Sequence, residues 1–133
     1  MELLKRLTEA VAPSGNEEVV CELIKSEIAP YVDEMQTDAL GNLIAHKKGG
    51  GKKLMLAAHT DEIGVIVTFL EENGFLRFSS VGGVDVHTSI GARVKFLNGT
   101  VGVVYCEEKR GAKDAKINDL YIDIGAKSRE EAQ

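Results

Sequence analysis

The chain has 133 residues, 44% of them hydrophobic, which suits one folded domain or one domain and part of a second and argues against wholesale disorder. Its 16 basic and 21 acidic side chains give a net charge of −5, and such a chain disfavours a nucleic-acid partner because phosphate backbones bind basic surfaces. The sequence has no apolar run of the roughly 18 residues that span a membrane, no signal-peptide core and only two cysteines, so we expect a cytoplasmic protein with reduced thiols.

Two helices are predicted in the first thirty residues. Leucine and valine at i, i+1, i+4 and i+8 favour a helix over residues 3–11, which the Pro13-Ser14-Gly15 segment ends. Ser14 and Glu17 have the spacing of a capping box, in which the hydroxyl and the carboxylate satisfy the first amides of a second helix. An apolar stripe over residues 19–28 supports that helix, and the proline at position 30 places its end near residue 28 or 29.

The period of the hydrophobic pattern changes to that of β-structure after residue 31. Two short strands are predicted around a turn, and a third at residues 54–58, where five consecutive apolar residues indicate a strand buried on both faces. Farther along, the pattern predicts antiparallel hairpins, with Asn98-Gly99 as a strong turn signal. The other predicted strands are 32–37, 43–46, 63–70, 75–81, 92–97, 100–106 and 120–124.

A polar cluster follows the predicted strand at 54–58. Ligands of α/β sheets gather at the carboxyl ends of strands, and His59 and Asp61 occupy that position. Residues i and i+2 of a strand share a face, so both side chains should point the same way. The carboxylate could then hold one imidazole nitrogen while the other binds a metal ion. A histidine at the edge of the core, paired with an aspartate, is the structural alternative, and the spacing alone leaves both open.

The remaining polar candidates have weaker patterns. His46 adjoins a lysine-rich segment and is predicted to lie on the surface, and His87 is predicted to lie in a loop. Glu107 and Glu108 are adjacent, so in a strand they would point to opposite faces, and a solvated charged loop is the better interpretation. Neither cysteine has a neighbouring base, which argues against a thiol nucleophile.

The segment LMLAAHTDEIG, residues 54–64, resembles the first metal-site segment of the glutamyl and deblocking aminopeptidases. These are dinuclear metallopeptidases of the TET type, whose members also carry the names endoglucanase and cellulase M. Further matching segments occur in the same order, so the resemblance covers nearly the whole chain. They are residues 8–17, 37–43, 74–78, 81–85 and 121–132.

The resemblance implies an α/β catalytic domain related to zinc exopeptidases, with a smaller β-rich, barrel-like dimerisation domain inserted into it. By this analogy residues 1–66 are the N-terminal part of the catalytic domain, and residues 67–133 are part of an incomplete inserted domain. His59 corresponds to a ligand of one of two divalent metal ions, zinc or cobalt. Asp61 corresponds to the catalytic-site carboxylate that orients this histidine. The family's other ligands and its glutamate base have no match here.

The resemblance therefore implies a metal-dependent aminopeptidase that removes N-terminal residues from peptides in the full-length context and forms homo-oligomers. The 133-residue chain alone is expected to be inactive, because catalytic zinc takes three protein ligands, and it need not bind a metal by itself. The alternative hypothesis is a non-catalytic assembly module that retains the dimerisation region. A glycoside hydrolase is disfavoured, because the chain has no tryptophan and only 5% aromatic residues.

Overall fold

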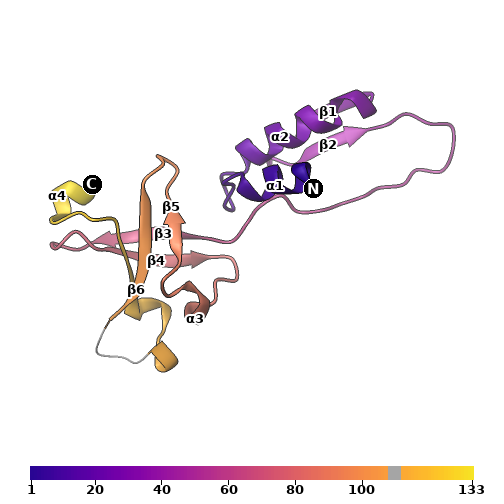
Figure 1. Cartoon of the computed structure of the whole chain (residues 1–133). Coiled ribbons are helices and arrows are strands. Elements are labelled where there is room, and N and C mark those ends of the chain that lie inside the picture. The colour runs from indigo at the N-terminus through magenta and orange to yellow at the C-terminus, as the bar shows by residue number, and fades with distance from the viewer. Residues whose placement is uncertain (108–111) are drawn as a thin grey trace. The chain divides into compact units, whose positions relative to one another are not determined.

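The computed structural model describes residues 1–107 and 112–133 (Figure 1). The chain divides into two compact units, residues 1–62 and residues 63–133. Helices and strands occur in both, so the chain has the predicted mixed α/β character. The assignment of residues 1–66 to a catalytic domain and of residues 67–133 to an inserted domain stays a prediction. In the described ranges, none of the helices combines the length and the apolar character that crossing a bilayer requires.

Two helices form the first part of the N-terminal unit. Helix α1 spans Glu2–Glu9, and helix α2 spans Glu18–Ile28 and continues into the 3-10 turn η1, Ala29–Tyr31. Both predicted helices are thus present, although α1 ends before Val11. Helix α2 directs Val20 and Cys21 inward, where they are 4% and 8% exposed. This burial accounts for the apolar stripe in its sequence.

The predicted capping box at the start of α2 is wrong. Glu17 is the N-cap residue and makes no side-chain cap; its carboxylate accepts a hydrogen bond from the Gly15 amide at 2.6 Å. The Ser14 hydroxyl instead donates to the Asp61 carboxylate. Capping competes with every other acceptor that the fold brings within reach of a short hydroxyl side chain, and here a carboxylate distant in sequence prevails.

Strands β1, Glu34–Thr37, and β2, Leu43–His46, form an antiparallel hairpin. The Asp38 side chain closes its turn. One carboxylate oxygen accepts from the amides of Leu40 and Asn42, both at 2.9 Å, and the other accepts from the Asn42 side-chain amide at 2.8 Å. Such a side-chain-to-backbone turn is what aspartate at this position favours.

The hairpin turn should depend on pH through Asp38. The hydrogen bonds from the Asn42 side chain and backbone lower the pKa of Asp38 below its ordinary 3.8. A lowered folded-state pKa contributes stability above the unfolded pKa, and this contribution is lost as pH falls through the folded pKa. We expect faster exchange of the Asn42 amide below pH 3.8, after correction for intrinsic rates, and Asp38→Asn should remove most of that pH dependence. Native-state hydrogen exchange followed by NMR would check this.

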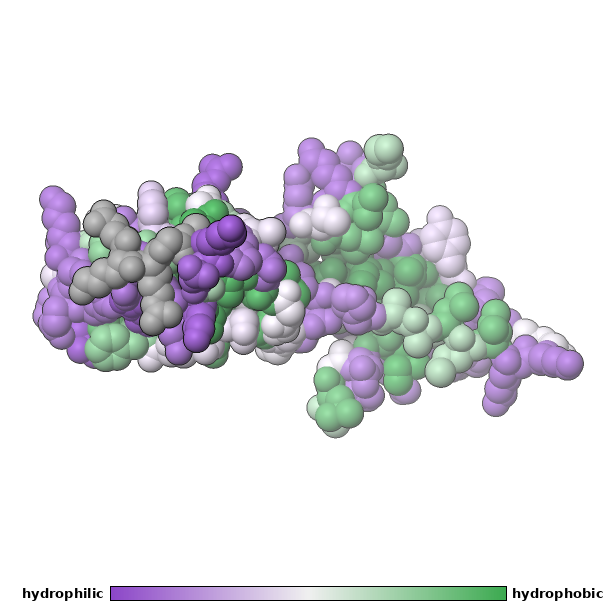
Figure 2. All heavy atoms as spheres, turned by 90° about the horizontal axis from the view of Figure 1, so that it is seen from below, coloured by the Kyte–Doolittle hydropathy of each residue, from purple (hydrophilic) through white to green (hydrophobic). Residues whose placement is uncertain are grey.

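The predicted buried strand at residues 54–58 does not form. The segment has no regular structure, and Leu54, Met55 and Leu56 are 84%, 85% and 89% exposed. A strand buried on both faces needs a neighbour along each edge and a layer over each face. Among the described residues of the N-terminal unit, no third strand joins β1 and β2. Figure 2, in which hydrophobic residues are green, shows apolar side chains exposed on the surface.

The C-terminal unit is built on a five-stranded antiparallel sheet. Its strands are β3 Gly64–Leu70, β4 Leu76–Val81, β5 Arg93–Lys95, β6 Val101–Cys106 and β7 Leu120–Asp123. Their order in the sheet is β3-β4-β7-β6-β5. All five downstream strands predicted from the sequence are present, within three residues of the expected ends. The prediction that His87 lies in a loop is wrong, because His87 lies in the one-turn helix α3, Val86–Ser89. The Asp85 carboxylate caps this helix by accepting a hydrogen bond from the Thr88 amide at 2.8 Å. The other elements of this unit are η2 Ala112–Asp114, η3 Ile117–Asp119 and α4 Arg129–Ala132.

The core of this unit lies on one face of the sheet. Its residues alternate along β4, β6 and β7 and are at most 4% exposed, which is the period-two pattern of a half-buried sheet. The opposite face carries exposed apolar residues at Ile66, Phe69 and Tyr105. The fully packed core residues are Leu76, Phe78, Val104, Leu120 and Ile122.

Gly102 on β6 leaves room for the core side chains of the neighbouring strand. A Cβ atom at this position would lie 2.5 Å from Cγ2 of Ile122 and 3.0 Å from Cγ2 of Ile124. We expect Gly102→Ala to lower the free energy of unfolding by about 1–3 kcal/mol, because an added methyl overpacks this contact. Gly83→Ala is the control, since a Cβ there meets nothing within 4 Å. Urea unfolding of both variants would test this, and equal midpoints would contradict it.

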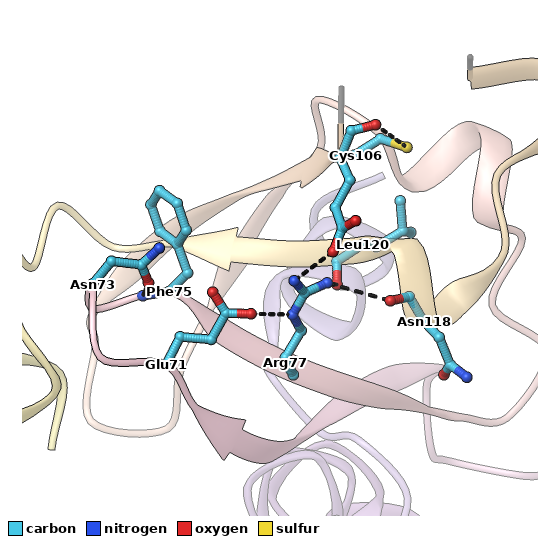
Figure 3. Close-up of polar contacts among 8 residues, drawn as sticks. Glu71, Asn73, Phe75, Arg77, Cys106, Asn118 and Leu120 are labelled. Atoms are coloured by element: carbon cyan, nitrogen blue, oxygen red, sulfur yellow. Dashed lines mark hydrogen bonds and ion pairs between the residues drawn. The ribbon is translucent and has the colours of Figure 1, made fainter. Parts of the chain in front are cut away.

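Arg77 on β4 forms hydrogen bonds with three different segments of the C-terminal unit (Figure 3). Its guanidinium donates to Glu71 at 2.5 Å, to Glu107 at 2.6 Å and to the Asn118 carbonyl oxygen at 3.2 Å. Glu107 is therefore held in an ion pair, not merely solvated as predicted. Glu108, the other half of that carboxylate pair, lies outside the described residues. A planar five-donor group suits such a junction better than the point charge of a lysine.

Candidate metal-binding site

His59 and Asp61 are in contact. The Nδ1 atom of His59 lies 3.0 Å from Oδ1 of Asp61 and 3.0 Å from the backbone oxygen of the same residue. Both oxygens are acceptors, so in the neutral ring the proton belongs on Nδ1 and the Nε2 atom keeps its lone pair. The His59 side chain is 85% exposed. The arrangement therefore presents one unprotonated imidazole nitrogen, the form that binds a metal ion.

The Asp61 carboxylate is shared between two donors. Ser14 Oγ donates to Oδ2 at 2.5 Å, while Oδ1 faces the His59 ring. The hydrogen bond from Ser14, followed by that from His59, lowers the pKa of the Asp61 carboxyl from its ordinary value. Asp61 is therefore a carboxylate at neutral pH, as an acceptor for an Nδ1–H group must be.

Residues 12 and 13 hold the polar segment through hydrogen bonds with Glu62. Glu62 N donates to the Ala12 carbonyl oxygen at 3.0 Å, Ala12 N donates to a Glu62 carboxylate oxygen at 2.9 Å, and Pro13 and Glu62 pair as an isolated parallel bridge. Ala12 is 2% exposed. The segment after the apolar run is thus ordered without being a strand, and the two side chains meet for a different reason than strand geometry.

The sequence interpretation missed Ser14 and Glu62 as partners in this site. Ser14 lies 47 residues from Asp61 and stands in a good capping pattern, so its local context pointed elsewhere. No periodicity relates two loop segments so far apart in sequence. His46, the other candidate near this unit's hairpin, is exposed as predicted and lies 3.5 Å from Glu34.

His59 and Asp61 together fit one protein ligand of a metal ion and not a complete metal site. Across residues 1–107 and 112–133, no group of three or more histidine, cysteine, aspartate or glutamate side chains could hold a metal ion. The exposed Nε2 of His59 suits one position of a zinc or cobalt centre, and catalytic zinc takes three protein ligands. The remaining ligands of any such centre must come from outside this set.

The model of the M42 glutamyl aminopeptidase family matches residues 41–133, a range that includes His59 and Asp61. The chain belongs to this family. The resemblance seen in the motifs around residues 54–64 is thereby confirmed. Both predicted site residues lie within the matched range, whereas Ser14, which was not predicted, precedes it.

Individual relatives match nearly the whole chain. A protein of Acetivibrio thermocellus, provisionally named an aminopeptidase, is 59% identical over 132 residues, which is 98% of this chain and 40% of that protein. The crystal structure of a TET aminopeptidase from a marine-sediment thaumarchaeote matches with a TM-score of 0.89 at 35% identity, covering 99% of this chain and 40% of the other. The chain thus spans about 40% of the length of these relatives.

A second solved structure bears on assembly. The TET1 peptidase of Pyrococcus horikoshii matches with a TM-score of 0.85 at 37% identity, over 98% of this chain and 42% of that one. That peptidase is described as assembling into a tetrahedron or a large octahedral shell.

Proposed function

We propose that this chain supplies a metal ligand, His59, and its orienting carboxylate, Asp61, to a metal-dependent aminopeptidase that acts on peptide N-termini in the full-length context. The observation that carries the proposal is the contact of His59 Nδ1 with Asp61, which leaves Nε2 open within the range matched by the M42 family. Aminopeptidase is also the activity named for the relatives.

Each residue has a defined task in this proposal. Two divalent ions, zinc or cobalt, would supply Lewis-acid activation of the scissile carbonyl when bound. Asp61 keeps the His59 proton on Nδ1, and His59 directs Nε2 outward as a ligand. Since the described residues supply one of the three protein ligands that catalytic zinc takes, the 133-residue chain alone should be inactive.

The test is a chimera in which this chain replaces the corresponding 132 residues of the Acetivibrio thermocellus relative. Supplied with zinc or cobalt, the chimera should release the N-terminal residue from aminoacyl-p-nitroanilides and short peptides, and chelation should abolish the release. The isolated 133-residue chain, assayed beside it, should release none. A folded but inactive chimera would refute the proposal, and metal-dependent release by the isolated chain would refute the inactivity assigned to it.

We also propose that the chain contributes to a homo-oligomer, as the assembly of the Pyrococcus horikoshii peptidase suggests. In the C-terminal unit, Ile66, Phe69, Val101 and Tyr105 expose 46–58% of their surfaces, an apolar face of the kind that subunits cover. Sedimentation velocity of the 133-residue chain should show dimers or larger species. The fraction of chain in these species should be lower in the Ile66→Asp variant. If the 133-residue chain formed oligomers but its chimera had no activity, the assembly-module alternative would be favoured instead.

A further inference from the structure

The turn at residues 13–16 places a hydroxyl group against the carboxylate of the candidate site. Asn16 N donates to the Pro13 carbonyl oxygen at 2.8 Å, and Gly15 adopts a φ of 89°, which a residue with a side chain rarely does. This closed turn directs Ser14 toward Asp61, which it meets at 2.5 Å. Two hydrogen bonds hold the two segments in that register: Glu62 N donates to the Ala12 carbonyl oxygen, and Ala12 N donates to the Glu62 carboxylate.

The His59 ring depends on polar contacts for its orientation. With 85% of its side chain exposed, packing restrains the ring little. Its Nδ1 atom is held by Asp61, and the Asp61 side chain is itself 37% exposed. A carboxylate bound through only one oxygen can rotate about its last torsion, whereas a donor on its second oxygen restricts that rotation.

We propose that Ser14 is a positioning residue of the metal site: by holding Oδ2 of Asp61, it keeps Oδ1 on the His59 Nδ1–H group and so keeps Nε2 free to bind a metal ion. This inference deepens the proposed function and rests on it for the role of Nε2. It assigns to the first turn of the chain a part in the site formed by residues 59–61. If the role of Ser14 were purely structural, it would stabilise the contact between the two segments without affecting the His59 ring.

The tautomer of His59 reports this role without any metal or substrate. In the ¹⁵N-labelled 133-residue chain at a pH of about 8, where imidazoles are neutral, long-range ¹H–¹⁵N correlations distinguish Nδ1–H from Nε2–H rings. The wild-type His59 should be mainly Nδ1–H. Ser14→Ala should lower the ratio of Nδ1–H to Nε2–H about 5-fold, the change in an equilibrium constant that loss of one ordinary hydrogen bond produces.

Three further variants separate positioning from packing. Ser14→Thr keeps the hydroxyl, and because Ser14 is exposed the extra methyl has room, so the wild-type ratio should return. Ser26→Ala removes another exposed hydroxyl, on α2, and should change nothing. Asp61→Ala should lower the ratio at least as far as Ser14→Ala does.

Each contrary outcome overturns the inference. The first is a ratio of Nδ1–H to Nε2–H that does not change in Ser14→Ala. The second is a fall of this ratio in Ser14→Thr as large as that expected in Ser14→Ala. The third is a ratio that does not change in Asp61→Ala. Loss of slow exchange at the Glu62 amide in Ser14→Ala would also overturn it, since Ser14 would then serve only the contact between the segments. The ratio does not depend on the activity of the chimera, so failure of the proposed function and failure of this inference are distinguishable.

Discussion

His59→Ala should lower the aminopeptidase activity of the chimera by about 10³-fold or more, because a catalytic metal centre that loses one protein ligand no longer holds its ion in place. Nδ1 of His59 contacts Asp61, so Nε2 is the ring nitrogen that the proposed function assigns to the metal ion. The loss should appear in kcat/KM together with a lower metal content per chain. Kinetics with an aminoacyl-p-nitroanilide and mass spectrometry of bound metals would measure the two effects.

The matched control for this prediction is His46→Ala. His46 is also an exposed histidine of the N-terminal unit near a carboxylate, with Nδ1 3.5 Å from Glu34, but it lies on the hairpin and not in the polar segment. Its replacement should leave activity and metal content within about 2-fold of the unmodified chimera, as expected for a surface change. If His59→Ala retained both activity and metal while the chimera was active, the assignment of the ligand would be wrong.

Ile122→Ala should destabilise the C-terminal unit by about 2–5 kcal/mol, a large share of the roughly 5–15 kcal/mol that stabilises a typical domain. Ile122 is 0% exposed at the centre of the core, and its Cγ2 atom fills the space left by Gly102. Truncation removes buried methyl and methylene groups and leaves a cavity that the neighbouring strands cannot close. Urea unfolding followed by circular dichroism would give the difference in free energy of unfolding.

Leu97→Ala provides the comparison for this second prediction. Leu97 is 68% exposed beside the Asn98-Gly99 turn, so its truncation should change the free energy of unfolding by no more than about 0.5 kcal/mol. Losses of similar size in the two variants would mean that the core of this unit does not lie where the structure places it.

Local patterns predicted the strands of the C-terminal unit well. Alternation places Leu76 and Phe78 on one face of β4, and Asn98-Gly99 lies in the turn between β5 and β6. These signals are local because a strand's two faces and a tight turn are decided by residues two to four apart. The M42 resemblance was equally visible, because it resides in contiguous motifs such as residues 54–64.

The errors lie where burial or bonding depends on distant residues. Residues 54–58 have the composition of a buried strand, but composition shows only that burial would be favourable and not that neighbours are present to provide it. Ser14 has the spacing of a helix cap, yet its hydroxyl bonds to Asp61. In both cases the local signal was real, and a tertiary contact or its absence decided the outcome.

The sequence by itself determined the two N-terminal helices, the strands of the C-terminal sheet, the M42 family and the two residues, His59 and Asp61, that the candidate site is built from. Only the tertiary structure decided that Ser14 holds Asp61, that the open nitrogen of His59 is Nε2, and that Gly102 makes room for Ile122. The physical reason is the range of the interactions. Periodicity and turn propensity act over a few residues and leave a pattern in the chain, whereas hydrogen bonds and packing between distant residues become apparent only once the fold brings their atoms together.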